Sequence, residues 1–178
     1  RLLLAVVQLM RADWERASGE RRVELAQANF AFHLFFAAGF RANEPFSEKV
    51  LRFARSFVVG RSAQTRGVMP HFYVCASLQT KTERFELTRV PCAYATCASC
   101  PLAPGEWGVR VIRALNAVGR GPAQRDAELL LFATPSGKRW TMKFFWSEHV
   151  KPRLEQLQRE GNGGLTRECD LEAWGTNS

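Results

Sequence analysis

The residues best suited to chemistry in this chain are an arginine and a glutamate spaced three apart, Arg41 and Glu44, in the stretch Gly-Phe-Arg-Ala-Asn-Glu. They directly follow an apolar run, so a charge is placed at the edge of a core. If the next turn is helical, the carboxylate of Glu44 can pair with the guanidinium and fix its planar fork. Such a fork suits two oxygens of one phosphate. An ordinary ion pair at a helix start is the alternative explanation.

The elements that must position this pair begin with core helices over residues 2–58. Apolar residues at helical spacing predict a first helix over 2–16 and a second over 20–38. The second helix is apolar on nearly all faces over 30–38, which is typical of a helix buried in a core. A short helix over 47–58 completes the group.

A lysine lies in the turn of a predicted β-hairpin at 71–91. Residues 71–78 are rich in aromatic and branched side chains, and residues 85–90 alternate well enough to pair with them. The connection between the two runs contains Lys81, which is thereby placed at the tip of the turn. A lysine exposed at a turn without any further role is the alternative explanation.

Two more helices are predicted in the C-terminal half, at 106–118 and at 141–160, followed by a tail over 161–178. Thr141 can cap the second of these helices, and Pro152 is expected to kink it or divide it in two. The chain is long enough for one domain with a sizeable core. These patterns predict a single, mainly helical α+β domain with a small antiparallel β-hairpin or sheet that carries the lysine turn.

Basic residues are spread along the whole chain. The formal net charge is +8, and 20 of the 25 basic residues are arginine. A spread from Arg11 to Arg167 favours a basic surface on a folded domain, and nucleic acid is the commonest polyanionic partner of such a surface. A basic protein without that partner is the alternative. No apolar run reaches the roughly 18 residues that a spanning helix needs, so no membrane partner is expected.

Three of the five cysteines follow one another as Cys92, Cys97 and Cys100. A structural zinc site needs four ligands, and only the C-x2-C pair matches half of such a site. Cys169 is distant in the sequence. We expect buried, reduced thiols inside a cell and no bound metal. A small zinc-stabilised interaction domain stays open as an alternative.

The Gly-x-Arg-x-x-Glu stretch, followed by the Thr-Lys-Thr turn, resembles the tyrosine recombinase or phage integrase superfamily, especially the integrases of DIRS-like mobile elements and their algal relatives. The likeness covers roughly residues 20–178. It implies an integrase-like catalytic domain that acts in DNA recombination and integration without a cofactor. It also implies that Arg41 clamps the phosphate, that Glu44 supports it, and that Lys81 is the general acid. By the same likeness, further contacts to the DNA backbone would come from Thr80, Thr82 and Arg84.

The sequence departs from that family in the second half of its active site. No His-x-x-Arg occurs, because His149 is four residues from Arg153, and neither Tyr73 nor Tyr94 lies where the family has its nucleophile. We therefore expect a C-terminally incomplete recombinase domain that binds double-stranded DNA without cleaving it. Its parent would self-associate on DNA inside the cell, and in the nucleus of a eukaryote. A non-catalytic basic nucleic-acid-binding domain is the alternative.

Overall fold

The computed structural model describes part of the chain, and for most residues outside the strands that description includes side chains. Within the described part, no helix is long and apolar enough to cross a membrane. The strands are described by their backbone alone. The described residues are 1–38, 46, 57–61, 72–79, 85–92, 104–121, 130–162, 164, 165 and 171.

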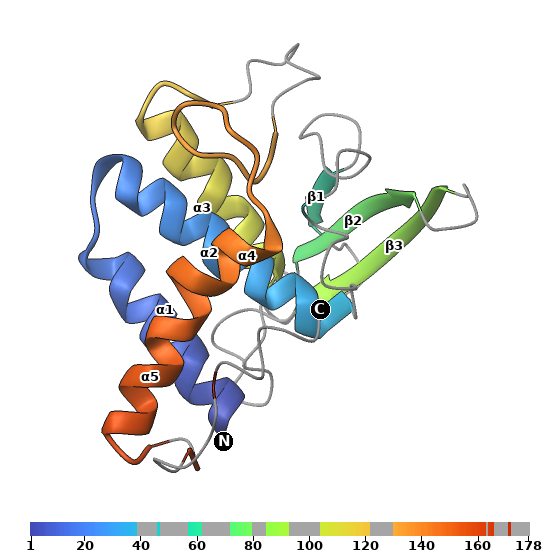
Figure 1. The fold of residues 1–178 in the computed structure, drawn as a ribbon. Helices are drawn as coiled ribbons and strands as arrows, with labels where there is room; N and C mark the ends of the chain where they lie inside the picture. The colour runs from blue at the N-terminus through green and yellow to red at the C-terminus, as the bar shows by residue number, and fades with distance from the viewer. Residues whose placement is uncertain are drawn as a thin grey trace.

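Two adjacent helices, α1 (Leu2–Arg16) and α2 (Gly19–Ala38), begin the fold (Figure 1). The turn between them is tight, and Gly19 takes a φ of 53° there, a conformation that other residues rarely adopt. The buried side chains of α1 form one stripe at helical spacing, which is the amphipathic pattern that the sequence predicts. They are Val6, Val7, Met10 and Trp14.

The middle of α2 is buried on every face, and its polar side chains are hydrogen-bonded to backbone carbonyl groups. Gln27 donates to the carbonyl of Leu131 at 2.7 Å, and Asn29 donates to that of Met10 at 3.1 Å. These bonds use the amide donors of both side chains and fix α2 against two other segments, while Oδ1 of Asn29 has no hydrogen-bond partner among the described residues. The helix becomes exposed before its end, as Phe36 shows with an exposed fraction of 54%. The centroid of the Phe36 ring lies 4.8 Å from that of Phe32.

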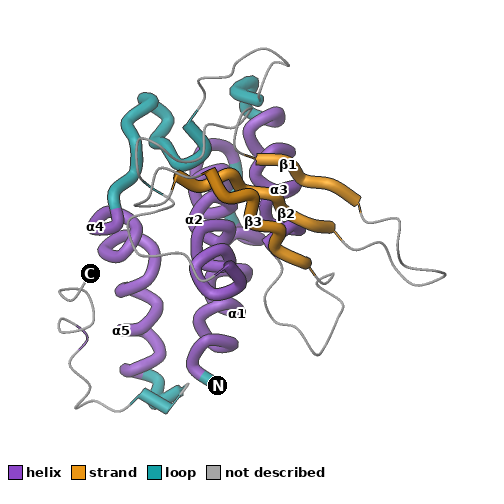
Figure 2. The backbone as a smooth tube through the Cα atoms, turned by 90° about the vertical axis from the view of Figure 1, so that its right-hand side faces the viewer, coloured by secondary structure: helices purple, strands orange, loops and turns teal. Residues whose placement is uncertain are grey.

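Helix α3 (Pro104–Ala117) lies between α2 and a three-stranded sheet. The strands are β1 (Phe57–Arg61), β2 (Phe72–Gln79) and β3 (Phe85–Cys92), and both neighbouring pairs are antiparallel. The order in the sheet is β1-β2-β3. Figure 2 shows the sheet and α5 on opposite sides of the central helices.

The mainly helical class that the sequence predicts is confirmed. One boundary is wrong, because residues 57 and 58 lie in β1 and not in the core helices expected over 2–58. Residues 80–84, which include the turn with Lys81, lie outside the described residues. The integrase-like fold and its lysine-bearing hairpin therefore stay predictions.

The region predicted as one helix over 141–160 consists of three helical pieces. These are α4 (Met142–Phe145), a π-helical segment (Trp146–Val150) and α5 (Lys151–Arg159). Thr141 caps α4, since its hydroxyl accepts a hydrogen bond from the amide of Phe144 at 3.1 Å. Pro152 lies in the first turn of α5, where a missing amide proton costs nothing, and so the helix is divided near the proline as expected.

Aromatic rings fill the core between α2 and the C-terminal helices. Phe46 contacts the rings of Phe132 and Phe145 at centroid distances of 5.4 and 5.5 Å. The segment predicted as a tail reaches the same core, because Leu165 and Leu171 are buried in it. Two side chains of the segment predicted as a tail over 161–178 therefore belong to this core.

Candidate functional site

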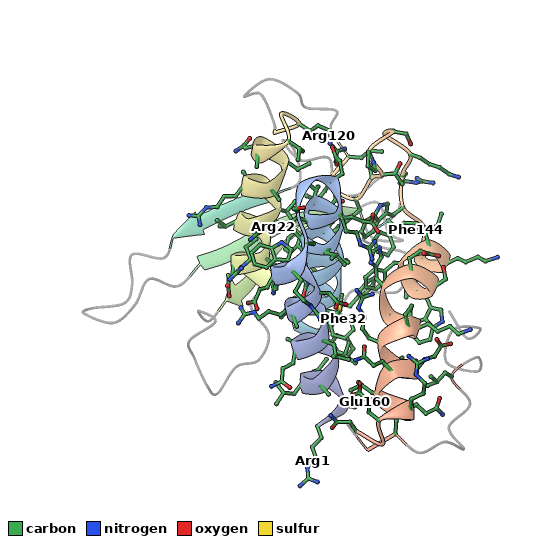
Figure 3. All side chains as sticks on the ribbon, turned by 90° about the vertical axis from the view of Figure 1, so that its left-hand side faces the viewer. Arg1, Arg22, Phe32, Arg120, Phe144 and Glu160 are labelled. Carbon is green, nitrogen blue, oxygen red and sulfur yellow. The ribbon has the colours of Figure 1, made fainter. Side chains whose placement is uncertain are left out.

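A basic groove of about 540 Å³ lies where α3 meets α1 and α2. Figure 3 shows Arg22 there, between α2 and α3. One wall is α3, whose residues 106, 110, 113, 114 and 117 line the groove at helical spacing. We refer to this feature as the arginine groove. Its lining residues are Trp14, Arg22, Glu106, Val109, Arg110, Arg113, Ala114 and Ala117.

Trp14, which lines the arginine groove, and the neighbouring Trp107 both carry arginine side chains on their rings. Trp14 and Trp107 meet edge to face with centroids 5.3 Å apart, and both are buried. The guanidinium carbons of Arg22 and Arg110 each lie 4.3 Å from the centroid of Trp14. Attraction between a cation and an aromatic face holds a guanidinium group in such a position. Both arginines are therefore oriented before any ligand arrives.

A glutamate holds the guanidinium groups of Arg110 and Arg11 together beside the tryptophans. Glu106 accepts hydrogen bonds from Arg11 at 3.1 and 3.2 Å and from the Nε of Arg110 at 2.8 Å. A second nitrogen of Arg110 also contacts the same carboxylate. The carboxylate is 13% exposed, so water screens these contacts only partly. The donors of Arg110 that face Glu106 are thus occupied.

Arg22 and Arg113 differ from Arg110 in having no carboxylate partner among the described residues. Glu106 is the one acidic side chain among the residues that line the arginine groove, and it is already shared by two arginines. The described lining therefore has an excess of positive charge. A guanidinium fork with unused donors binds carboxylate or phosphate oxygens in pairs.

A buried histidine lies behind Trp107. The His33 ring is 5.9 Å from the Trp107 ring, and its side chain is 1% exposed. Burial, with a smaller contribution from the positive charge of Arg11, lowers the pKa of His33 from 6.5 to about 3. His33 is therefore neutral at pH 7. Within the described ranges, no group of three potential ligands is placed to hold a metal ion.

A second buried cluster joins α1 to the C-terminal helices. Arg153 donates to Asp13 at 2.7 Å and to the carbonyl groups of Glu148 and His149 at 3.2 and 2.8 Å. The His149 ring is fully buried and stacks on Trp140, with centroids 5.0 Å apart. Burial is the main reason that the pKa of His149 falls to about 3. His149 and Arg153 are buried and Asp13 is partly exposed, and the cluster is structural in character.

The site residues predicted from the sequence all lie outside the described residues, and their roles stay predictions. They are Arg41, Glu44, Thr80, Lys81, Thr82 and Arg84. The side chains of the cysteines are also not among those that the structure describes, so the zinc alternative stays open.

The arginine groove was not predicted from the sequence. A usable signal was present, because Glu106, Arg110 and Arg113 follow one another at spacings of four and three on a predicted helix, next to the inward-facing Trp107. What spacing alone does not reveal is that α1 and α2 bring Trp14 and Arg22 to the same place.

Comparison with known proteins identifies no relative. No protein-family model matches the sequence. No curated protein is significantly similar to it. No solved structure is significantly similar to it. The function must therefore be argued from the residues themselves.

Proposed function

We propose that this protein binds nucleic acid and that the arginine groove contacts its phosphates. The main support is that Arg22 and Arg113 have no carboxylate partner among the described residues, in a groove whose described lining has an excess of positive charge. Arg22 is also held on the Trp14 ring at 4.3 Å. Fixed guanidinium groups of this kind match the geometry and charge of a phosphodiester.

The charge of the whole chain supports the same proposal. A net charge of +8, dominated by arginine, attracts a polyanion from a distance. The phosphate backbone of nucleic acid supplies most of the affinity in such complexes through the release of counterions. A small anion would be attracted by the positive charge, but it would contact only a few of the basic residues that are spread along the chain.

A more specific form of the proposal is that the chain is part of a tyrosine recombinase that binds double-stranded DNA. It rests on the resemblance of the stretch with Arg41 and Glu44, and of the turn with Lys81, to that superfamily. In this form Arg41 and Lys81 contact the DNA, with Glu44 as the support of Arg41. The rival is a non-catalytic basic nucleic-acid-binding domain in which these residues have no special role.

Binding to a fluorescent 20-base-pair DNA duplex, followed by anisotropy at several salt concentrations, tests the general proposal. We expect Arg22→Gln and Arg113→Gln each to weaken binding on the order of tenfold and to lower the slope of log K against log salt by about 1. The matched control is Arg159→Gln, which removes an exposed arginine at the end of α5. If both groove variants behave like the control, the arginine groove is not a phosphate site.

The same assay separates the two forms of the proposal. The recombinase form expects Arg41→Gln and Lys81→Ala to weaken duplex binding beyond the effect of Arg159→Gln. Equal affinities for those variants and the control would favour the non-catalytic domain. Stoichiometric zinc that survives dialysis would instead favour the zinc-stabilised interaction domain.

A further inference from the structure

We infer that the arginine groove recognises the sugar-phosphate backbone of a polynucleotide and does not stack or read its bases. This inference rests on the proposed function and specifies its ligand. Aromatic residues in a basic groove usually indicate base stacking, as in proteins that bind single strands. The geometry of Trp14 and Trp107 points instead to binding of the sugar-phosphate backbone.

The tryptophan rings are not open to a base. Trp14 is 8% exposed and Trp107 is 1% exposed. Arg22 and Arg110 lie 4.3 Å from the centre of the Trp14 ring, and Arg110 lies 5.0 Å from that of Trp107. A base needs an exposed ring face of its own size, so it would first have to displace an arginine. In this groove the indoles hold the arginines in place.

Apart from its arginines, the described groove lining has no free group that reads base edges. Asn and Gln, which pair with adenine, do not occur among its described lining residues. The carboxylate of Glu106, which could accept from cytosine, is taken by Arg11 and Arg110. The rest of the α3 wall is apolar and small, with Val109, Ala114 and Ala117. Among the described lining residues, only the guanidinium groups of Arg22 and Arg113 could still reach a base edge, that of guanine, and the two duplexes of unrelated sequence below test for it.

Arg22 and Arg113 remain, and their chemistry suits phosphate. The Arg22 fork is restrained by its position on Trp14, so less side-chain freedom is lost when a phosphate binds. Phosphate contacts of this kind are the same for every sequence. We therefore assign the arginine groove to sequence-independent binding of the backbone.

Four ligands of equal length test this assignment by fluorescence anisotropy. They are two DNA duplexes of unrelated sequence, one of their single strands, and an abasic strand that keeps the phosphates and lacks the bases. We expect Arg22→Gln and Arg113→Gln to weaken binding of all four by factors that agree within about twofold, on the order of tenfold each. Arg159→Gln is the control, and far-UV circular dichroism verifies that each variant is folded.

Two other results have distinct meanings. If the groove variants weaken binding to the natural strand but not to the abasic strand, or to one duplex sequence only, bases are recognised and the assignment is wrong. If the groove variants match the control with all four ligands, the proposed function of the groove fails as well. A variant that does not fold is replaced by Arg22→Lys or Arg113→Lys, which keep the charge without the planar fork.

Discussion

The guanidinium carbon of Arg110 lies 4.3 Å from the centre of the Trp14 ring, across the junction of two helices that are distant in the sequence. The same side chain donates to Glu106 from its Nε at 2.8 Å. The guanidinium group of Arg110 is thus held on its planar face by the Trp14 ring and at its edge by the carboxylate of Glu106. This double restraint allows α1 and α3 to pack through charged residues without leaving a buried charge unpaired.

Glu106→Gln tests how much this arrangement contributes to stability. The change removes the negative charge that Arg11 and Arg110 share, so we expect the free energy of unfolding to fall by about 1 to 2 kcal/mol. Partial exposure of both arginines keeps the loss at the low end. Urea denaturation at pH 7 measures it.

Glu155→Gln is the matched control for that experiment. Glu155 is 45% exposed and forms a pair with Lys151 at 3.9 Å, a geometry that stabilises little. We expect its loss to cost less than about 0.5 kcal/mol. Equal costs for the two variants would mean that Glu106 is no more than another surface carboxylate.

The elements that the sequence predicts well are those whose signal is local. Thr141 precedes an apolar helical pattern, and its hydroxyl indeed caps α4. The stripe of Val6, Met10 and Trp14 identifies the buried face of α1 in the same way. Residues 57 and 58 were misassigned because whether a short apolar run becomes helix or strand depends on its neighbours in space.

Thr141→Ala should remove the cap and destabilise the protein by about 1 kcal/mol, because the amide of Phe144 then loses its partner. Thermal or urea unfolding measures the difference. Thr141→Ser keeps the hydroxyl and should stay close to the wild-type value. A serine variant as unstable as the alanine variant would show that the methyl group matters, and not the hydrogen bond.

Buried histidines should make the protein less stable in acid. The pKa values of His33 and His149 are about 3 in the folded protein, against 6.5 for an unperturbed histidine. Below pH 6.5 the two histidines therefore become protonated in the unfolded chain, whereas in the folded chain they stay neutral down to about pH 3. Stability is full above pH 6.5 and falls as the pH drops through that window. Between pH 7 and pH 5 the expected loss is about 2 kcal/mol for each histidine.

His149→Phe isolates one of these two contributions. Neither ring nitrogen of His149 forms a hydrogen bond among the described residues, although Nε2 lies 3.4 Å from Oε1 of Glu24, and Phe can keep the stacking on Trp140. We expect less than about 1 kcal/mol of change at pH 7. The loss between pH 7 and pH 5 should shrink by about 2 kcal/mol. An unchanged pH dependence would mean that His149 does not stay neutral in the folded protein.

Features that depend on distant segments could not be predicted in this way. An arginine and a histidine in an amphipathic helix are expected at its surface, yet Arg153 and His149 are buried. Their burial requires Asp13 on α1 to meet Arg153, which is 140 residues away. The arginine groove has the same cause, since Trp14 and Arg22 reach α3 only through the packing of three helices.

A double-mutant cycle on Asp13 and Arg153 measures that long-range contact. Asp13→Asn leaves the buried guanidinium with carbonyl partners only, and we expect it to cost about 2 kcal/mol, since Asp13 is 33% exposed and partly screened. Arg153→Met also destabilises the protein, because it removes the bonds to the carbonyl groups of Glu148 and His149. The double variant should cost less than the sum by about 1 to 2 kcal/mol.

The control for the cycle is Arg16→Gln, because Arg16 also contacts Asp13, at 2.9 Å, but is 74% exposed. Its coupling to Asp13→Asn should stay below about 0.5 kcal/mol. Strict additivity of Asp13→Asn and Arg153→Met would contradict the structure at this point, since two groups joined by a partly buried 2.7 Å hydrogen bond cannot act independently. A measured coupling would instead establish that α5 is held to α1 by this ion pair as well as by the surrounding apolar contacts.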